Sequence, residues 1–345
     1  MKVLVTGGAG FVGSHAAEFF SQDNNVTVYD NLSRSQLLGG QDKNRRYNLD
    51  HLRARGPKIE FHEADLRDFQ SLKNAAKETD FIVHTGGQVA VTTSLKDPRT
   101  DFEINALGTL NVLETARAND AAMVFCSTNK VYGENVNDIR VVDKGKRYAF
   151  DDPHFLNGIP GNFSIDNTGH SPYGSSKLAA DIYVQDYAHT YGLRTCVLRM
   201  SCIYGERQFG VEDQGWLAWL IISTITGRRI TIYGDGKQVR DTLYVDDLID
   251  AIDRFQRSKM RRAVFNMGGG PRNTLSLLEL LDLLREITGL KPELSFQEWR
   301  PADQRVYISD IRDAQDMLRW KPKVAPRDGV KRVVNWVREN IRLFN

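Results

Sequence analysis

The sequence predicts an α/β protein built on a doubly wound parallel sheet, followed by a smaller C-terminal α/β region. Two observations predict this fold class. Short apolar runs alternate with helix-like segments through the first two hundred residues, and such alternation produces parallel strands joined by right-handed crossovers. The first of these units also places a glycine-rich turn between a strand and a helix. In such sheets ligands bind outside the carboxyl ends of the strands.

The first unit predicts a dinucleotide site. It consists of a strand, a glycine turn, a helix and a second strand, predicted at 3–5, 6–13, 11–20 and 26–29. Gly7 allows a tight turn, Gly10 lets the backbone N–H groups reach a pyrophosphate, and Gly13 lets the helix pack close to the sheet. The pyrophosphate would lie at the positive end of the helix dipole. Asp30 would accept hydrogen bonds from the adenosine ribose and favours NAD over NADP.

The bulk composition is that of an ordinary soluble protein. The 345 residues include 41% hydrophobic and 26% charged residues with a formal net charge of +2, so the charge balance favours neither nucleic acid nor a membrane surface. The first strand begins at the N-terminus, so we expect no signal peptide. Cys126 and Cys196 lie in apolar runs and Cys202 lies apart from them, without metal-ligand spacing. We therefore expect buried thiols, no metal and a cytoplasmic location.

Two further strands supply candidate cofactor residues. Apolar runs predict them at 59–62 and 80–84. Asp65 follows the first and is placed to accept a hydrogen bond from the adenine amino group; the alternative is an N-cap for the helix that begins near Phe69. Gly86 and Gln88 follow the second, where small residues would let a cofactor pass close to the backbone.

The remaining elements are predicted from their apolar periodicity. Helices are expected at 101–117, 173–191, 214–226, 246–255, 275–287 and 327–341, and strands at 122–126, 194–199, 230–233, 242–245 and 263–266. Between 134 and 172 the pattern breaks into a polar, aromatic stretch that is too long for an ordinary connection. Its aromatic residues argue against disorder, so we expect a lid or one wall of a pocket there.

Three residues have the pattern of an acid–base site. Tyr173 and Lys177 lie four apart at a helix start and share one helical face. A lysine ammonium nearby lowers the pKa of a tyrosine, which is about 10 in a free side chain. Such a tyrosine can take a proton from a substrate hydroxyl while hydride leaves the same carbon. Thr128, at a strand end, could hydrogen-bond the same hydroxyl.

These motifs resemble the extended short-chain dehydrogenase/reductase superfamily, and within it the nucleotide-sugar epimerases and dehydratases. The resemblance rests on TGGAGFVG, Asp65, Asn105, Thr128, Tyr173-x-x-x-Lys177 and Tyr204-Gly205 and covers nearly the whole chain. It implies a tightly bound NAD and a homodimer, or a tetramer, formed through helices near 101–117 and 173–191. The further cofactor contacts that it implies are Phe11, Val12, Asn31, Leu66, Gly86, Gln88 and Asn105.

The segment after Thr128 narrows the chemistry. The 4,6-dehydratases of this superfamily carry an Asp-Glu pair there, and this chain has Asn129-Lys130, which cannot replace an acid–carboxylate pair. The chain is most similar to the CDP-paratose 2-epimerases, also called CDP-tyvelose epimerases, through 127–133, 164–174 and above all 201–216. The resemblance implies that NAD oxidises the hexose at C2 with Tyr173 as base, and that hydride returns to the opposite face. The assignment to C2 comes from the resemblance alone.

Anionic and polar groups of a nucleotide-sugar substrate need partners, for which the sequence offers several candidates. They are Asn129, Lys130, His170, Arg207, Gln208, Arg240, Arg300 and Asp303. Guanidinium groups suit phosphate oxygens. For each arginine taken alone a surface salt bridge is the alternative, and for His170 a structural role is the alternative.

The predicted organisation is an NAD-binding Rossmann domain over 1–199, with 134–172 as a lid-like insertion. The region 200–345 would bind the nucleotide sugar, and parts of 237–266 would return to the Rossmann sheet. The leading hypothesis is a nucleotide-sugar 2-epimerase. The alternatives are a UDP-hexose 4-epimerase, a net nucleotide-sugar oxidoreductase that releases NADH, and a catalytically silent NAD-binding regulator.

Overall fold

The computed structural model describes the chain except residues 39–43, 56–58, 301–302 and 345. The chain folds into two compact units, each assembled from segments that are far apart in the sequence. Unit 1 comprises 1–131, 171–199 and 249–265, and unit 2 comprises 132–170, 200–248 and 266–345.

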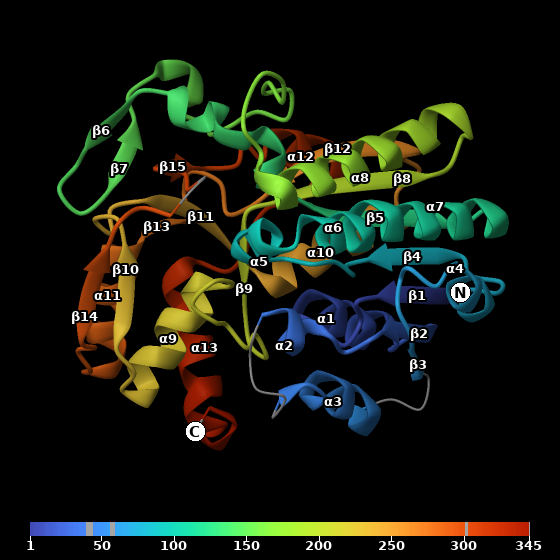
Figure 1. Cartoon of the computed structure of the whole chain (residues 1–345), viewed down its shortest axis with the longest axis horizontal. Helices are drawn as coiled ribbons and strands as arrows, with labels where there is room; N and C mark the ends of the chain where they lie inside the picture. The colour runs from blue at the N-terminus through green and yellow to red at the C-terminus, as the bar shows by residue number, and fades with distance from the viewer. Residues whose placement is uncertain (39–43, 56–58, 301–302, 345) are drawn as a thin grey trace. The chain divides into compact units, whose positions relative to one another are not determined.

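Unit 1 is built on a seven-stranded sheet with the order β12-β8-β5-β4-β1-β2-β3 (Figure 1). The strands are β1 (Lys2–Thr6), β2 (Asn25–Asp30), β3 (Ile59–Glu63), β4 (Phe81–His84), β5 (Ala122–Thr128), β8 (Thr195–Met200) and β12 (Arg262–Met267). Strand β1 pairs in parallel with both β2 and β4, and β3 and β5 extend the sheet in parallel on either side. The order reverses at β1, as in a doubly wound sheet, so the predicted fold class is confirmed.

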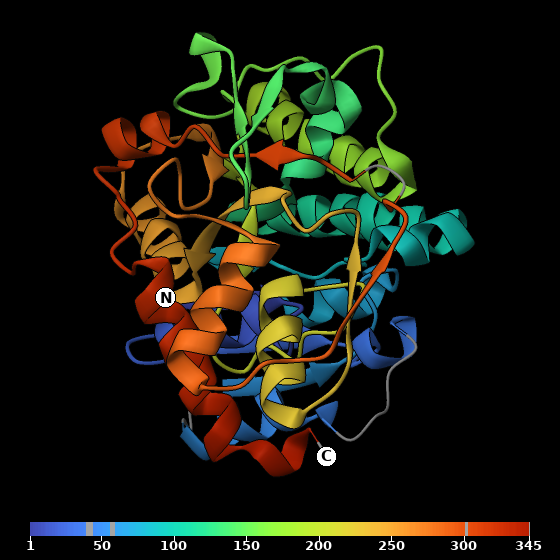
Figure 2. The ribbon, with the colours of Figure 1, turned by 90° about the vertical axis from the view of Figure 1, so that its left-hand side faces the viewer.

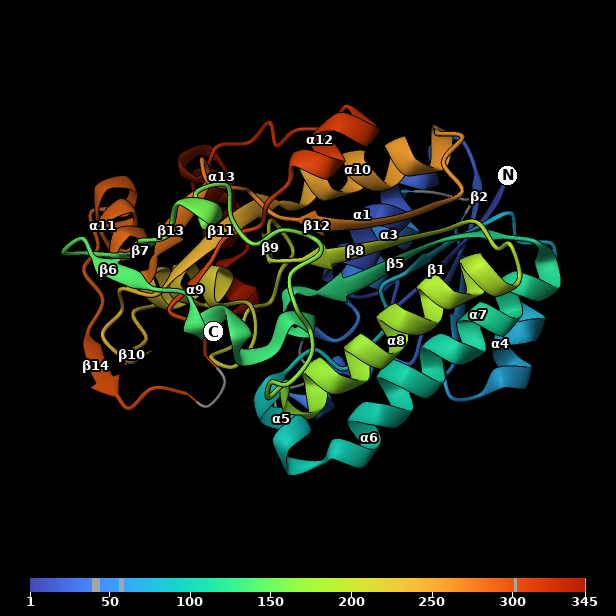
Figure 3. The ribbon, with the colours of Figure 1, turned by 90° about the horizontal axis from the view of Figure 1, so that it is seen from above.

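Helices cover both faces of this sheet. They are α1 (Phe11–Phe20), α2 (Arg34–Leu37), α3 (Tyr47–Arg55), α4 (Phe69–Ala75), α5 (Val91–Lys96), α6 (Pro98–Phe102), α7 (Gly108–Asn119), α8 (Ser171–Thr190) and α10 (Val245–Arg257), the last of which begins in unit 2. Figure 3 shows α4, α7 and α8 on one face and α1 on the other. A core cluster beneath α4, α7 and α8 contains the fully buried Leu4, Ile82, Val112 and Phe125, so apolar burial fixes these helices on the strands.

The helix expected at 101–117 is interrupted. Helix α6 ends at Phe102, a π-helical turn η2 occupies Glu103–Leu107, and α7 continues from Gly108. The π-turn is only five residues long, which is too short for apolar periodicity to distinguish it from an α-helical turn. π-turns inside helices are frequent at functional sites, and Asn105 lies within this one.

Unit 2 combines three small sheets with a helical layer. Its strands are β6 (Val141–Asp143), β7 (Tyr148–Phe150), β9 (Cys202–Tyr204), β10 (Ile230–Tyr233), β11 (Val239–Tyr244), β13 (Thr274–Ser276), β14 (Leu294–Gln297) and β15 (Val306–Tyr307). Strand β11 pairs with β9, β13 and β15, β10 with β14, and β6 with β7. The helices are α9 (Trp216–Thr226), α11 (Leu277–Thr288), α12 (Arg312–Leu318) and α13 (Pro326–Glu339), with short 3₁₀ turns at Asn129–Asp138, Pro153–Phe155 and Ile341–Leu343. Figure 2 shows α9, α11 and α13 packed together.

Most predicted elements appear within a few residues of their expected positions. The short elements α2, α3, α5, β9, β13, β14, β15 and α12 were not expected. The segment 134–172 is ordered and forms the β6–β7 hairpin and short 3₁₀ turns. Among the described residues no helix has the length and apolar character needed to cross a membrane. The same residues contain no group of three or more potential metal ligands.

Candidate active site

The glycine turn between β1 and α1 forms a narrow cradle. Gly7 has φ +66° and its N–H donates to the carbonyl of Tyr29 at 2.8 Å. A Cβ on Gly13 would lie 2.2 Å from the Gly7 carbonyl oxygen, so the turn requires glycine there. At Gly10 an added Cβ would meet only that same carbonyl oxygen, at 3.0 Å, among the described residues. The space over Gly10 is therefore open, which fits a pyrophosphate lying over the N-terminus of α1 beside Phe11 and Val12.

Asp30, at the end of β2, is hydrogen-bonded to the backbone of this turn. Its carboxylate accepts from the Ala9 N–H at 3.0 Å and from the Leu32 N–H at 2.7 Å. Burial raises the pKa of Asp30, and these backbone donors act against that rise. The Gly10 N–H also acts on this carboxylate. Because a carboxylate offers about four acceptor positions, one position remains for a ribose hydroxyl group.

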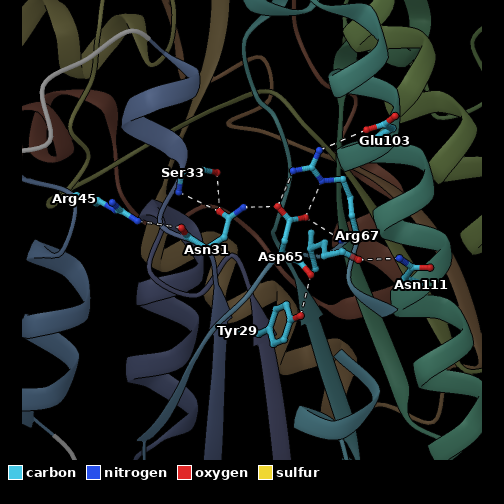
Figure 4. A network of polar contacts seen from close by, with 9 residues as sticks. Tyr29, Asn31, Ser33, Arg45, Asp65, Arg67, Glu103 and Asn111 are labelled. Carbon is cyan, nitrogen blue, oxygen red and sulfur yellow. Dashed lines mark hydrogen bonds and ion pairs between the residues drawn. The ribbon is translucent and has the colours of Figure 1, made fainter. Parts of the chain in front are cut away.

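Asp65 lies in a polar network at the ends of β2 and β3 (Figure 4). One oxygen accepts from Arg67 N and Nε, both at 2.9 Å, and the other from Arg67 Nη2 at 2.9 Å and from Asn31 Nδ2 at 2.8 Å. The bond to Arg67 lowers the pKa of Asp65 to about 2. Because a carboxylate offers about four acceptor positions, an adenine amino group would have to displace one of these donors. The N-cap of α4 is Asp68, so the alternative of Asp65 as that cap is wrong.

Thr128 and Tyr173 meet at the end of β5. The Thr128 hydroxyl hydrogen-bonds the Tyr173 side chain, and it also accepts from the Lys130 N–H at 3.2 Å. Burial raises the pKa of Tyr173 to about 12, and the bond to Thr128 acts against this rise. The chain by itself therefore holds Tyr173 as a neutral phenol.

Lys177 lies one helical turn after Tyr173 and is buried. Its ammonium donates to the Cys126 carbonyl at 2.8 Å and lies 4.0 Å from the centroid of the Phe125 ring. Burial lowers the pKa of Lys177 to about 8. A Cβ on Gly87 would lie 4.0 Å from the lysine nitrogen, so the loop after β4 closes over this group.

Gln88 and Asn105 were expected to contact the cofactor, and the structure joins them to each other. Asn105 Oδ1 accepts from the Gln88 N–H at 2.9 Å, and both side-chain amides donate to Asp101. Leu66 lies against the positions where Gly86 and Gly108 lack side chains. Gly86 itself is pressed against Gly7, where an added Cβ on Gly7 would lie 2.6 Å from its Cα.

The candidate substrate residues fall into both units. Asn129 and Lys130 follow Thr128 in unit 1, and Asn129 is buried. The other six, His170, Arg207, Gln208, Arg240, Arg300 and Asp303, belong to unit 2.

Within unit 2 the structure brings Arg240 and Asp303 together. Arg240 Nη2 lies 2.6 Å from Asp303 Oδ1, and the arginine side chain is 10% exposed. Arg300 pairs with Asp213 at 2.9 Å, and its guanidinium lies 3.9 Å from the centroid of the Tyr233 ring. Both arginines are thus already held by acidic partners, so phosphate oxygens would have to share or replace those contacts.

The other unit 2 candidates are held by backbone groups or are buried. His170 Nε2 contacts the Ile165 carbonyl at 2.8 Å, while Nδ1 is buried without a hydrogen-bond partner among the described residues. Gln208 donates to the Ile203 carbonyl at 3.3 Å, and its buried side-chain oxygen has no hydrogen-bond partner in the part of the chain that the structure describes. Arg207 is 6% exposed and has φ +62°, a conformation that costs energy in a residue other than glycine.

Comparison with known proteins decides the family. Residues 3–268 match the model of the "NAD dependent epimerase/dehydratase family". The chain belongs to this family. NAD is therefore its cofactor, as the glycine cradle and Asp30 predict. The chain is 40% identical to the CDP-paratose 2-epimerase of Salmonella typhi over 97% of this chain and 99% of the relative. It is 33% identical to a putative UDP-glucose 4-epimerase of Methanocaldococcus jannaschii over 99% of each.

Solved structures agree with this membership of the epimerase/dehydratase family. The UDP-glucose 4-epimerase of Thermotoga maritima, solved with UDP-glucose, covers 99% of the chain with a TM-score of 0.82 and 31% identity, and all of that structure is matched. The UDP-glucose 4-epimerase of Thermus thermophilus, solved with NAD, covers 98% of the chain and 99% of that structure with a TM-score of 0.79 and 31% identity.

The sequence interpretation of this family member missed several residues that shape the site. Arg67 saturates Asp65, Asp101 joins Gln88 to Asn105, and Asp181 forms a buried pair with Arg199 at 3.0 Å. One signal was present in the sequence: Asp101 and Asn105 lie four apart in the helical stretch, a spacing that places polar side chains side by side. The partners of Asp65 and Asp181 come from tertiary contacts that spacing does not reveal.

Proposed function

We propose that this family member epimerises a nucleotide-activated hexose at C2 by transient oxidation to a 2-keto sugar. The observation that carries the proposal is the hydrogen-bonded Thr128–Tyr173 pair with a buried Lys177, in a chain that is 40% identical to a CDP-paratose 2-epimerase. An epimerisation returns the cofactor to its starting state. We therefore expect NAD to remain tightly bound through the turnover.

The chain's own groups would act on the hydroxyl of the sugar. Bound at the glycine cradle, NAD supplies a hydride acceptor and returns the hydride later. Tyr173 takes the hydroxyl proton, and Thr128 holds the same oxygen by a hydrogen bond. The Lys177 ammonium stabilises the phenolate by its charge. After the keto sugar has presented its other face, Tyr173 gives the proton back.

Residues 129–130 support epimerisation over elimination of water. A dehydratase needs an acid and a carboxylate beside the sugar, and this chain offers an amide and an ammonium, Asn129 and Lys130. Neither group can act as a carboxylate base. Both can donate hydrogen bonds to sugar or phosphate oxygens, which is the role that we assign to them.

Unit 2 would provide the nucleotide site. Arg240 and Arg300 are proposed to bind the diphosphate, with Asp303, Arg207, Gln208 and His170 contacting the rest of the substrate. Guanidinium groups bind phosphate oxygens in a bidentate fashion, and an acidic partner such as Asp303 holds Arg240 in place. We propose that 134–172 forms one wall of this site.

A product analysis tests the proposal directly. The purified protein is incubated with CDP-, UDP- and GDP-hexoses in deuterated water without added cofactor, and NMR resolves the epimers. We expect inversion at C2 with hydrogen retained at the inverted carbon. Deuterium at that carbon would show deprotonation chemistry and reject the proposed mechanism. Tyr173→Phe should abolish turnover, while Tyr183→Phe, on the exposed side of the same helix, should retain it.

The same experiment separates the main alternative. Similarity to a putative UDP-glucose 4-epimerase, at 33% identity, and to solved UDP-glucose 4-epimerases favours a UDP-hexose 4-epimerase as the second candidate. That function predicts inversion at C4 only. A net oxidoreductase would instead accumulate NADH absorbance in proportion to substrate when NAD is in excess.

We also propose a homodimer formed through the π-interrupted helix and α8. Helices α7 and α8 lie side by side on one face of the sheet (Figure 3). Phe102, Leu107, Ile182 and Tyr183 on these segments are 41–55% exposed, and grouped apolar side chains at a surface mark an interface. Phe102→Glu with Ile182→Glu should shift the mass measured by light scattering to that of a monomer. Met317→Glu, on the exposed side of α12, is the control.

We propose a cytoplasmic location. The three cysteines are free thiols, and Cys126 and Cys196 are buried, as is usual in a reducing compartment. Fractionation of cells that express the chain, followed by immunodetection, tests this location. Recovery in a membrane or secreted fraction would contradict it.

A further inference from the structure

A buried polar cluster lies beside the catalytic lysine in unit 1. It consists of Asp101 on α6, Gln88 in the loop after β4, Asn105 in the π-turn and Ser176 on α8, which we call the Asp101 cluster. Each of these four residues is at most 2% exposed. A carboxylate with so little exposure is costly unless its oxygens are hydrogen-bonded, and such a group at this depth requires an explanation.

Every contact to the Asp101 carboxylate in this cluster comes from a neutral donor. One oxygen accepts from Gln88 Nε2 at 2.7 Å and from Asn105 Nδ2 at 3.1 Å, and the other accepts from Ser176 Oγ at 2.5 Å. Hydrogen bonds donated to a carboxylate stabilise its ionised form. Burial raises the pKa of Asp101, and the hydrogen bonds from Ser176 and Gln88 and the charge of Lys177 act against that rise. The donors of the cluster therefore favour a negative charge on Asp101.

The Asp101 cluster also fixes the backbone around the lysine. Asn105 Oδ1 accepts from the Gln88 N–H at 2.9 Å, which ties the π-turn to the loop after β4. Ser176 immediately precedes Lys177 on α8. A Cβ on Gly87 would lie 2.8 Å from Asn105 Oδ1 and 4.0 Å from the Lys177 nitrogen. The cluster and the lysine thus both lie close to Gly87.

Two buried carboxylates, Asp101 and Asp181, stabilise the charge on Lys177. Among the described residues only Asp181 forms an ion pair with an arginine. Asp181, on the same helix, pairs with Arg199 through both oxygens at 3.0 Å. Asp101 receives neutral donors instead. Burial disfavours the charged lysine, and Cys126, Asp181 and Asp101, in that order, act against this effect. The other titratable groups that act with the lysine are the buried Cys126 on β5 and His84 on β4.

We propose that Asp101 is a positioning residue for the reaction, because its buried carboxylate, which has no arginine partner among the described residues, helps to keep the Lys177 ammonium charged. It also holds Gln88, Asn105 and Ser176 in the arrangement that encloses the lysine. The consequence for turnover rests on the proposed function. The effect on the lysine itself does not depend on which sugar reacts.

The test compares Asp101→Asn with Asp97→Asn. Asp97 is an exposed acid four residues earlier that caps α6 by accepting from the Thr100 N–H at 3.0 Å, and asparagine is an equally good cap. Lysines labelled with ¹³C are titrated by NMR, and Lys177→Arg assigns the signal. We expect the Lys177 midpoint to fall by about one pH unit in Asp101→Asn and to be unchanged in Asp97→Asn.

The pH profile of kcat gives the second measurement. Asp101 also helps to raise the pKa of Tyr173, so its removal should displace both limbs of the profile to lower pH by about one unit. A role confined to packing would lower kcat equally at every pH and leave the Lys177 midpoint in place. That pair of results would overturn the proposal.

A second variant and the NMR titration cover the cases in which Asp101→Asn does not fold or no hexose is turned over. If Asp101→Asn does not fold, Asp101→Ser also removes the negative charge and should lower the Lys177 midpoint in the same direction. An unchanged midpoint in Asp101→Ser would then reject the proposal. If no hexose is turned over, the proposed function fails while the NMR titration still decides the role of Asp101.

Discussion

His84 should make the stability of unit 1 sensitive to acid. It ends β4, is fully buried, and stacks on Phe125 with ring centroids 5.3 Å apart. Its Nε2 lies 2.9 Å from Thr109 Oγ1, and that hydroxyl donates to the Asn105 carbonyl at 2.5 Å. Thr109 must therefore accept from Nε2–H. Nδ1 is left to accept from Thr6 Oγ1 at 2.6 Å, so the ring is neutral with both nitrogens satisfied.

The direction of the pH effect follows from the pKa of this ring. Burial, followed by the charge of Lys177, lowers the pKa of His84 to about 3, against about 6.5 in an unfolded chain. Between these values the unfolded state binds a proton that the folded state excludes. The contribution of neutral His84 to the free energy of unfolding is complete above pH 6.5. It is lost as the pH falls toward 3, by about 1.4 kcal/mol per pH unit. At pH 5 the loss is about 2 kcal/mol.

Proton uptake on unfolding measures this directly. At pH 5.5 an unfolded imidazole is about 0.9 protonated, so unfolding the wild-type chain in guanidinium should take up about 0.9 proton more than unfolding His84→Gln. A pH-stat in weak buffer records the difference. At pH 8 the two chains should take up equal numbers, which separates titration from packing. Equal uptake at pH 5.5 would refute a neutral, buried His84.

Two further substitutions test the cofactor turn and the buried pair. Gly13→Ala places a methyl group 2.2 Å from the Gly7 carbonyl oxygen, so the turn must open. We expect the amount of NAD that co-purifies with the protein to fall at least tenfold. Absorbance after dialysis and acid release measures this amount. Asp181→Asn leaves the guanidinium of Arg199, 7% exposed, without its buried counter-charge. It should lower the free energy of unfolding by about 3–5 kcal/mol in urea titrations. Asp186→Asn, exposed on the same helix, should change it by less than about 0.5 kcal/mol.

The sequence predicted those features that short-range patterns determine. The glycine turn and the helix at 11–20 appear at the expected residues, because turn conformation and apolar periodicity are local properties. The π-turn was not predicted, since a segment of five residues is too short to be recognised from apolar periodicity. Asp65 was predicted as an adenine acceptor, and its saturation by Arg67 and Asn31 was not, because hydrogen-bond partners depend on how the strand ends meet.

The shifted pKa values of Tyr173 and Lys177 give a reason for the cofactor to stay bound. In the chain without its cofactor, burial is the main cause that raises the pKa of Tyr173 to about 12 and lowers that of Lys177 to about 8. Near neutral pH the phenol therefore keeps its proton while the lysine is charged. Positive charge near the phenol would lower its pKa. We expect Lys177 to supply part of this charge, and the oxidised nicotinamide, when bound, would supply the rest.

Tyr173 would therefore become a base only while NAD is in place and oxidised. A chain that released its cofactor at each turnover would lose its base each time. Asp101 would contribute by keeping Lys177 protonated. A lysine that lost its proton would remove the positive charge that the chain itself supplies near the phenol. Both the retention of NAD and the buried charge on Asp101 thus favour ionisation of the Tyr173 phenol in the site that holds NAD.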